Sequence, residues 1–303
     1  MSPVIKTANL TKRYGSIYAV RNVNLHIERG EIYGFVGLNG AGKTTLMRLL
    51  LGMVRPSSGQ AYVQGVHVGR RSYEIWRHVG YVIETATAYP ELTVEENIKI
   101  ACQLRLVPEN RGLELLEMLS LTMYRKKRAN DLSLGNKQRL ALVKALLHRP
   151  SILLLDEPVN GLDPAGIIEM RTLLRQLAEE EKTTIVLSSH LLDEMSQLAH
   201  RIGFIHAGTI ITEKNAAQLE NALQRRLVIE TKDAIKAKKS LQPLGVAANV
   251  QDKQSLFITD KEAIHYRERI AHQLVHHNVA IRYFAVERER LEDYFLRIIQ
   301  VKE

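Results

Sequence analysis

The sequence predicts an α/β domain built around a parallel sheet up to about residue 220, followed by a small α+β domain over residues 221–303. Three observations support this division. Apolar segments of strand length alternate with segments of helical spacing through the first two thirds of the chain, as in layered α/β domains. The remainder changes to the order strand, helix, strand, strand, helix, strand, which is that of a ferredoxin-like unit. The length of 303 residues fits about two domains.

The first domain is expected to open with strands and a helix. Strands are expected at Val4–Leu10, Val20–Ile27 and Glu31–Val36, and the third of them ends in a glycine-rich turn. A helix should follow from Thr44 to about Gly52, where glycine is a natural stop signal.

The middle of the first domain is expected to be helical and is followed by buried strands. Thr93 with Glu96 three residues later forms a capping-box pattern, so a helix should start there. Helical spacing continues to about residue 150, apart from a loop at Ala129–Leu132. Continuous apolar runs predict fully buried parallel strands at Ser151–Leu155, Thr183–Ser188 and Ile202–His206.

The second domain has four expected strands and three expected helices. The strands are Arg226–Thr231, Val246–Val250, Ser255–Thr259 and Val279–Val286. The helices are Ala234–Leu241, Glu262–His276 and Leu291–Ile299. This domain could be a stabilising appendage or a dimerising or regulatory unit, and the sequence leaves both readings open.

Composition and charge restrict the class of protein. Hydrophobic residues make up 45% and charged residues 25% of the chain, which is typical of folded proteins. No apolar run approaches the roughly 18 residues of a membrane-spanning helix, and no secretory signal is recognisable, so we expect a cytoplasmic protein. The single cysteine, Cys102, excludes an internal disulfide. The net charge of +9 is spread along the chain, which argues against a specific nucleic-acid partner.

A phosphate-binding loop follows the third strand. The segment GLNGAGKT, residues 37–44, fits the pattern G-x-x-x-x-G-K-[ST] between a strand and a helix. Its glycines let backbone N–H groups surround phosphates, and the helix N-terminus adds the positive end of its dipole. Lys43 can reach the β- and γ-phosphates, and the Thr44 hydroxyl can bind Mg²⁺. The expected nucleotide contacts here are Gly37, Asn39, Gly40, Ala41, Gly42, Lys43, Thr44 and Thr45.

An acidic pair, Asp156 and Glu157, closes the apolar run Ile152–Leu155. A buried strand ending in two acids has little structural reason to exist, because unpaired buried charge is costly. Asp156 can hold Mg²⁺ together with Thr44, and Glu157 can orient or deprotonate the attacking water. The pair therefore predicts hydrolysis of the bound nucleotide.

A third motif narrows the family. The segment LSLGNKQR, residues 132–139, shortly precedes the strand of Asp156 and resembles the signature motif of ABC-transporter ATPases. Further matches follow in that family's order: Tyr14 within LTKRYG, the segment NGLD at 160–163, and Ser188-Ser189-His190. The resemblance covers residues 4 to about 215. It implies a P-loop core with an N-terminal antiparallel β part and a helical signature subdomain at about 85–150.

The resemblance also implies residue roles. Tyr14 would stack on the adenine of ATP, Val20 would belong to the same site, and His190 would contact the γ-phosphate beside the general base Glu157. Asp163 would lie in a loop that crosses to a second subunit. In the head-to-tail dimer of the family, the γ-phosphate held by one subunit would be contacted by signature residues of the other, which here are Ser133, Gly135 and Asn136.

Two departures from the family pattern point to one of its branches. Leu134 and Asn136 stand where the signature usually has Gly and Gln. Glu84 ends the segment VGYVIE, where the family usually has Gln. Glu84 is expected near the nucleotide and Mg²⁺, as a coupling residue rather than the catalytic base. These features resemble the branch that serves bacitracin and lantibiotic self-protection exporters.

The leading hypothesis is therefore a subunit that hydrolyses Mg-ATP to power export by a separate membrane permease. It would lie peripherally on the cytoplasmic face of the membrane, paired with a second copy or a similar subunit. The alternative is an ABC ATPase acting on nucleic acid or the ribosome, but such proteins usually carry two cassettes or a long coiled-coil insertion. A nucleotide sensor without turnover is opposed by the presence of Glu157, Lys43 and His190.

Overall fold

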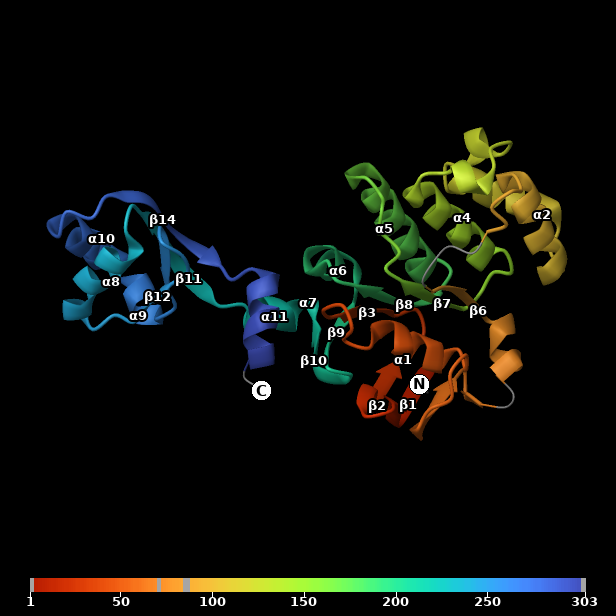
Figure 1. Cartoon of the computed structure of the whole chain (residues 1–303), viewed down its shortest axis with the longest axis horizontal. Coiled ribbons are helices and arrows are strands. Elements are labelled where there is room, and N and C mark those ends of the chain that lie inside the picture. Colours follow the sequence, from red (N-terminus) through yellow and green to blue (C-terminus); the bar gives the residue numbers. More distant parts are fainter. Residues whose placement is uncertain (1–2, 70–71, 84–87, 301–303) are drawn as a thin grey trace. The chain divides into compact units, whose positions relative to one another are not determined.

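A computed structural model describes residues 3–69, 72–83 and 88–300 of the protein. The chain divides into two units, Met1–Ala216 and Ala217–Glu303 (Figure 1). The boundary expected after residue 220 lies inside helix α7 (Ala216–Ala222). None of the helices in the described ranges is long and apolar enough to cross a membrane.

A six-stranded sheet lies at the centre of the first unit, within the residues described, in the order β10–β9–β3–β8–β7–β6. Its strands span Thr209–Asn215, Arg201–His206, Ile32–Val36, Thr184–Ser189, Ile152–Asp156 and Val79–Val82. All neighbouring strands are parallel except β10, which pairs antiparallel with β9. Every residue of β3, β7 and β8 is buried, which explains why these strands read as continuous apolar runs.

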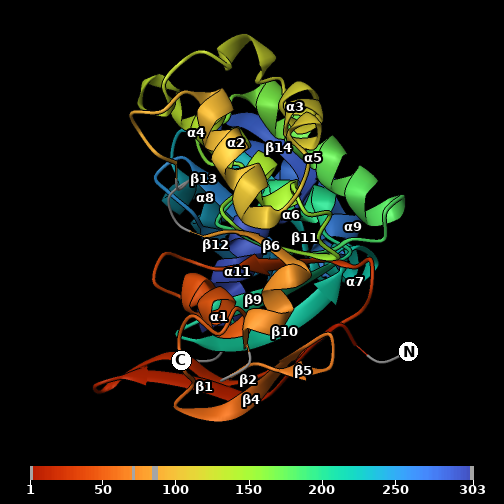
Figure 2. The same ribbon diagram turned by 90° about the vertical axis from the view of Figure 1, so that its right-hand side faces the viewer.

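A second, antiparallel sheet in the order β2–β1–β4–β5 opens the chain. Its strands span Ile17–Ile27, Ile5–Tyr14, Ser58–Val63 and Val66–His67. Helix α1 (Lys43–Leu50) lies between the two sheets, and its buried side chains join residues of both in one core. Figure 2 shows α1 between β1, β2 and β4 on one side and β6 and β9 on the other. The start of α1 is therefore held firmly from two sides.

The helical part of the first unit lies on the other side of the six-stranded sheet from α1 (Figures 1 and 2). Its helices are α2 (Val94–Arg105), α3 (Glu109–Met118) and α4 (Leu134–Leu146), with 3-10 turns at Thr122–Tyr124 and Ala129–Asp131; a further 3-10 turn spans Ser72–Arg77 ahead of β6. The capping box at Thr93 is confirmed, because the Thr93 hydroxyl accepts from the Glu96 N–H while the Glu96 carboxylate accepts from the Thr93 N–H. Helices α5 (Pro164–Glu179) and α6 (Leu192–Leu198) complete the unit.

The second unit contains an antiparallel sheet in the order β12–β13–β11–β14. Its strands span Ala248–Val250, Ser255–Ile258, Arg225–Thr231 and Ile281–Arg288. Three helices bury apolar side chains in the core on one face of this sheet: α8 (Ala234–Leu241), α9 (Lys261–His265) and α10 (Arg267–His276). A 3-10 turn spans Gln242–Leu244, and α11 (Leu291–Gln300) ends the described chain.

The prediction of a single helix at 262–276 is wrong, because Tyr266 separates two helices, α9 and α10. Ile264 packs against the core and Ile270 is buried in it. Residues six apart would point to different sides of a continuous helix. The break lets both helices turn an apolar side toward the sheet.

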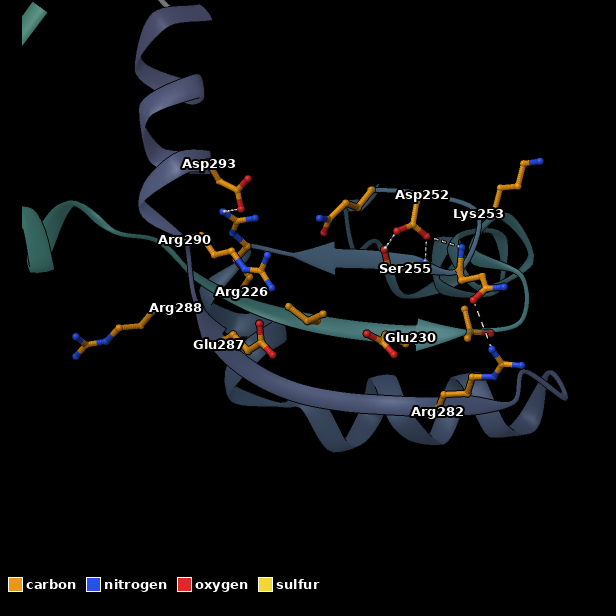
Figure 3. A pocket seen from close by; sticks show the side chains of 14 residues that line it. Arg226, Glu230, Asp252, Lys253, Ser255, Arg282, Glu287, Arg288, Arg290 and Asp293 are labelled. Atoms are coloured by element: carbon orange, nitrogen blue, oxygen red, sulfur yellow. Dashed lines mark hydrogen bonds and ion pairs between the residues drawn. The ribbon is translucent and has the colours of Figure 1, made fainter. Parts of the chain in front are cut away.

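The other face of this sheet forms an open pocket of about 640 Å³ (Figure 3). Its lining is mostly charged, with Arg226, Arg282 and Arg290 beside Glu230 and Glu287. Antiparallel sheets commonly leave one face to water. The alternation of opposite charges on this face fits that arrangement.

A buried ionic cluster attaches α11 to the sheet. Glu289 is only 4% exposed, and its carboxylate accepts hydrogen bonds from Arg297 at 2.9 and 2.7 Å and from the Gln224 N–H at 3.0 Å. Burial alone would raise the pKa of Glu289, but these hydrogen bonds and the nearby charge of Arg226 lower the pKa of this carboxyl. Arg226 also pairs with Asp293 at 3.0 Å (Figure 3).

Candidate functional site

Three neighbouring parallel strands bring the main site residues together. In the sheet β8 lies between β3 and β7, although it is the last of the three in the sequence. The phosphate loop follows β3, Asp156 ends β7 with Glu157 directly after it, and His190 directly follows β8. Because parallel strands end at the same edge of a sheet, segments about 150 residues apart meet there.

The phosphate loop needs glycine at specific positions. Gly42 has φ 106° and would place a Cβ 2.2 Å from the Ala19 carbonyl oxygen, so no other residue fits. A Cβ on Gly40, at φ 80°, would meet no atom within 4 Å, so its outer side is open. Asn39 is exposed at the bend, while Gly37 and Ala41 are buried. The loop is thus packed against Ala19 at Gly42 and open to a ligand at Gly40.

Lys43 is buried at the start of α1, and its ammonium is held by the loop itself. It donates hydrogen bonds to the carbonyl oxygens of Gly37 at 2.7 Å and Leu38 at 3.3 Å. It also lies 3.6 Å from the Glu157 carboxylate. A cation at a helix N-terminus is a suitable partner for an anion such as a phosphate, because the helix dipole is positive there.

Asp156 contacts the first turn of α1 and the neighbouring strand β8. Its Oδ2 accepts a hydrogen bond from the Thr44 hydroxyl at 2.6 Å, and its Oδ1 accepts a short one from the Ser188 hydroxyl. A hydroxyl and a carboxylate oxygen side by side are ligand types that Mg²⁺ accepts together with water and phosphate oxygens. The donor set therefore fits Mg²⁺ bound with a nucleotide. No cage of three or more His, Cys, Asp or Glu side chains occurs in the described part of the chain.

Glu157 projects from a strained turn directly after β7. Its φ of 51° lies in the left-handed region, which residues with a side chain rarely adopt. Its Oε2 lies 2.8 Å from His190 Nδ1, and its Oε1 lies near the Lys43 ammonium. The Glu157 side chain is 20% exposed and that of His190 is 46% exposed, so both can reach a ligand or water.

Of the two residues expected at the adenine site, Tyr14 is exposed and Val20 is buried. Tyr14 ends β1 and is 48% exposed, with the Lys12 ammonium 4.8 Å from its ring centroid. Its hairpin partner β2 carries Ala19, which touches the phosphate loop at Gly42. Val20 is wholly buried in the hydrophobic core, so it offers no exposed surface to a nucleotide and the assignment of Val20 is withdrawn.

The signature residues lie at the start of α4, on the other side of the sheet from α1 (Figures 1 and 2). Ser133 caps α4, and its hydroxyl accepts from the Asn136 N–H at 3.3 Å. Gly135 is buried against Gly161, because a Cβ there would lie 2.8 Å from the Gly161 carbonyl oxygen. Leu134 is 64% exposed. The structure therefore does not bring these residues to the phosphate loop of their own chain.

One expected residue, Asp163, stands apart from this cluster. Asp163 is exposed and caps α5, where its carboxylate accepts from the Gly166 N–H at 3.1 Å. Glu84 lies outside the described residues. Thr45, the last expected loop contact, is half-buried in the first turn of α1.

Sequence reasoning gave no role to Ser188 or Gln138, yet both touch the acidic pair. Ser188 donates to Asp156, and the Gln138 side chain donates to the Glu157 carbonyl oxygen at 3.4 Å. Both residues belong to motifs that were recognised, at Ser188–His190 and at 132–139. Their contacts, however, depend on strand and helix neighbours that only the folded chain provides.

Comparisons with known proteins agree with this geometry. A family model described as ABC transporter matches residues 20–160. The bacitracin transport ATP-binding protein BcrA of Bacillus licheniformis is 37% identical over 300 residues, which cover 99% of this chain and 98% of that protein. The lantibiotic transport ATP-binding protein SrtF of Streptococcus pyogenes is 40% identical over 218 residues, which cover 72% of this chain and 93% of that protein.

A solved structure supports the fold of the first unit. The ATP-binding cassette MJ0796, a dimer in a post-hydrolysis state bound to ADP and Pi, is 29% identical with a TM-score of 0.66. The match covers 70% of this chain and 98% of that chain. The expected cassette fold is therefore confirmed.

Proposed function

The chain belongs to the ABC transporter family as an ATP-binding subunit, and on that premise we propose that it powers export of a peptide antibiotic through a separate membrane permease. The observation that carries this proposal is the match to BcrA, which extends over nearly the whole of both chains. A bacitracin or lantibiotic type of substrate also fits the name of SrtF, which matches the first unit.

The chain is an ATPase, and the geometry supports specific roles in its nucleotide site. The Lys43 ammonium would exchange its loop carbonyl partners for the β- and γ-phosphates of ATP. Thr44 and Asp156 would hold Mg²⁺ from their adjacent oxygen atoms. When bound, Mg²⁺ neutralises phosphate charge. The exposed Tyr14 ring would stack on adenine.

Glu157 is the residue we assign as general base. Its carboxylate is partly exposed and lies between Lys43 and His190, so it can accept a proton from a water held at the γ-phosphate. His190 would orient this carboxylate through Nδ1 and present its remaining ring nitrogen to the γ-phosphate. These roles account for the unusual backbone of Glu157, since strain of this kind is typical of functional sites.

A second subunit would complete the site. The start of α4, with Ser133, Gly135 and Asn136, lies on the other side of the sheet from α1, and it presents an exposed helix N-terminus. A γ-phosphate on the partner's loop would bind there in a head-to-tail two-fold dimer, with Asp163 near the crossing. The dimeric state of the similar MJ0796 cassette supports this arrangement.

A groove of about 490 Å³ in the first unit would bind part of the permease. Its lining includes the apolar residues Met53, Leu104 and Ala141 and the basic residues Arg48, Arg105 and Lys144. We assign this groove to a short cytoplasmic segment of the permease with apolar and acidic side chains, because the charges would be complementary. Ile83 lines the groove, so Glu84, the next residue in the sequence, would couple nucleotide state to this contact.

The second unit would serve the dimer or its regulation, as a ferredoxin-like domain. Its strand order β12–β13–β11–β14 with every neighbour antiparallel supports that fold type. Binding to the permease would place the whole subunit peripherally on the cytoplasmic face of the membrane.

Sensitivity of the host to peptide antibiotics tests the proposal. Deletion of the gene should increase sensitivity to bacitracin or a lantibiotic. The wild-type chain should restore resistance, and Glu157→Gln, which keeps the fold but loses the proposed base, should not. Unchanged sensitivity after deletion, with intact ATPase activity of the purified chain, would reject antibiotic export but not the assignment as an ABC ATPase.

A further inference from the structure

Ser188 is the last residue but one of the buried central strand β8, and its hydroxyl contacts both members of the acidic pair. Its side chain is 0% exposed. The hydroxyl donates a short hydrogen bond to Asp156 Oδ1 and accepts one from the Glu157 N–H at 3.0 Å. A serine hydroxyl can donate once and accept as well, so a single side chain here serves both residues.

The strand register explains why the Ser188 hydroxyl reaches both Asp156 and Glu157. In the parallel pair β7–β8, Asp156 lies directly beside Ser188. The next peptide, at Glu157, leaves the strand with φ 51°, which turns its N–H back toward the Ser188 hydroxyl. The Glu157 carbonyl oxygen accepts from Gln138, so the backbone of Glu157 is held on both sides.

We propose that Ser188 is a positioning residue for ATP hydrolysis. Its hydroxyl holds the turn at Glu157, and thereby aims the Glu157 carboxylate between Lys43 and His190, while it orients Asp156 toward Thr44. This inference rests on the proposed roles of Asp156 and Glu157. It assigns to Ser188 an effect on turnover rather than on nucleotide binding, because Ser188 itself is enclosed and touches no open surface.

Ser188→Ala tests the proposal, with Ser189→Ala as the matched control. Ser189 is the next residue, is 2% exposed, and its hydroxyl accepts from the Leu191 N–H at 2.9 Å. Ser188→Ala should lower kcat about tenfold or more and change KM for ATP by less than about threefold, since the loss concerns the positioning of a general base. Ser189→Ala should keep wild-type kcat.

Two further measurements separate positioning from damage to the fold. Ser188→Cys leaves no cavity, because its thiol is somewhat larger than the hydroxyl, but it replaces the hydroxyl by a weak donor. It should therefore remain folded and still lose turnover. In a Glu157→Gln background, Ser188→Ala should add less than about a threefold loss, because residues that act as a unit are not additive.

Three outcomes would overturn the inference. They are wild-type kcat in folded Ser188→Cys, an equal loss in Ser189→Ala, and an undiminished effect of Ser188→Ala in the Glu157→Gln background. Wild-type turnover in Glu157→Gln alone would instead reject the proposed base. The failure of the inference and the failure of the proposed site roles are therefore distinguishable.

Discussion

The Nδ1 nitrogen of His190 lies 2.8 Å from the Oε2 oxygen of Glu157. An ionised carboxylate only accepts hydrogen bonds, so this pair places the proton of the imidazole on Nδ1 and leaves Nε2 for another partner. The contact joins the ends of two neighbouring strands, and it directs the carboxylate toward the Lys43 ammonium. Glu157 and His190 thus form one unit facing the phosphate loop.

Glu157→Gln should reduce Mg²⁺-dependent ATP hydrolysis by about 10²-fold or more, because the amide cannot take a proton from water. Binding of ATP should remain, since Lys43 and the loop are unchanged, and the variant should accumulate as an ATP-bound dimer. Phosphate release and size-exclusion chromatography with ATP measure the two effects. Turnover at the wild-type rate would remove Glu157 from its proposed role.

Lys43→Ala should weaken ATP binding by roughly 10- to 100-fold, the effect of losing a charged hydrogen bond of about 1.5–3 kcal/mol. Unlike Glu157→Gln, which lowers the rate of hydrolysis, Lys43→Ala weakens the binding of ATP in the ground state. Nucleotide binding is measured by titration calorimetry. Lys6→Ala, on an exposed position of β1, is the control and should bind ATP normally. Equal affinities of Lys43→Ala and wild type would contradict the assignment.

Leu134→Lys should leave the fold and ATP binding of the single chain intact, because this side chain is 64% exposed. It should weaken the ATP-dependent dimer about tenfold or more, since a lysine at the start of the signature helix places an unmatched charge in the proposed interface. Met123→Lys, at another exposed apolar residue, is the control. The measurement is dimer formation in the Glu157→Gln background. A dimer of unchanged stability would place Leu134 outside the interface.

Removal of the second unit should preserve the nucleotide site. A chain ending at Asn215 keeps β10 and every residue of the proposed phosphate and magnesium contacts. We expect this truncated chain to bind ATP as the full chain does, while dimer stability or its regulation changes. Fluorescent-nucleotide binding measures the first effect. A folded truncation that fails to bind ATP would show that the second unit completes the site.

Acid should destabilise the first unit through His148. Burial and the nearby charge of Arg105 lower the pKa of His148 to about 4, whereas a free histidine titrates near about 6.5. Between these values the unfolded chain binds a proton that the folded chain does not, so stability should fall as pH is lowered from about 6.5 to about 4.

The melting temperature at several pH values checks the prediction for His148. His148→Gln should show a weaker pH dependence than wild type in this window. His272→Gln changes an exposed histidine of α10 and should keep the wild-type dependence. Identical pH profiles of His148→Gln and wild type would contradict the assignment of this effect to His148.

Much of the local structure could be predicted from the sequence, because short-range chemistry decides it. Thr93 and Glu96 form their capping box as expected, and Ala234–Leu241 is a helix within the expected bounds. The loop with Gly42 and Lys43 also has its expected place between a strand and a helix. Where long-range packing decides, the prediction was wrong, as at Tyr266, where two helices replace one because each packs separately on the sheet.

The sequence by itself determined the phosphate loop, the acidic pair and the order of the family motifs, because each is a pattern of neighbouring residues. Only the tertiary structure decided that β8 lies between β3 and β7 and therefore that Ser188 touches Asp156 and Glu157. It also decided that Val20 is enclosed in the core and that Leu134 is exposed. Strand order and burial depend on residues far apart in the chain, so no local pattern contains them.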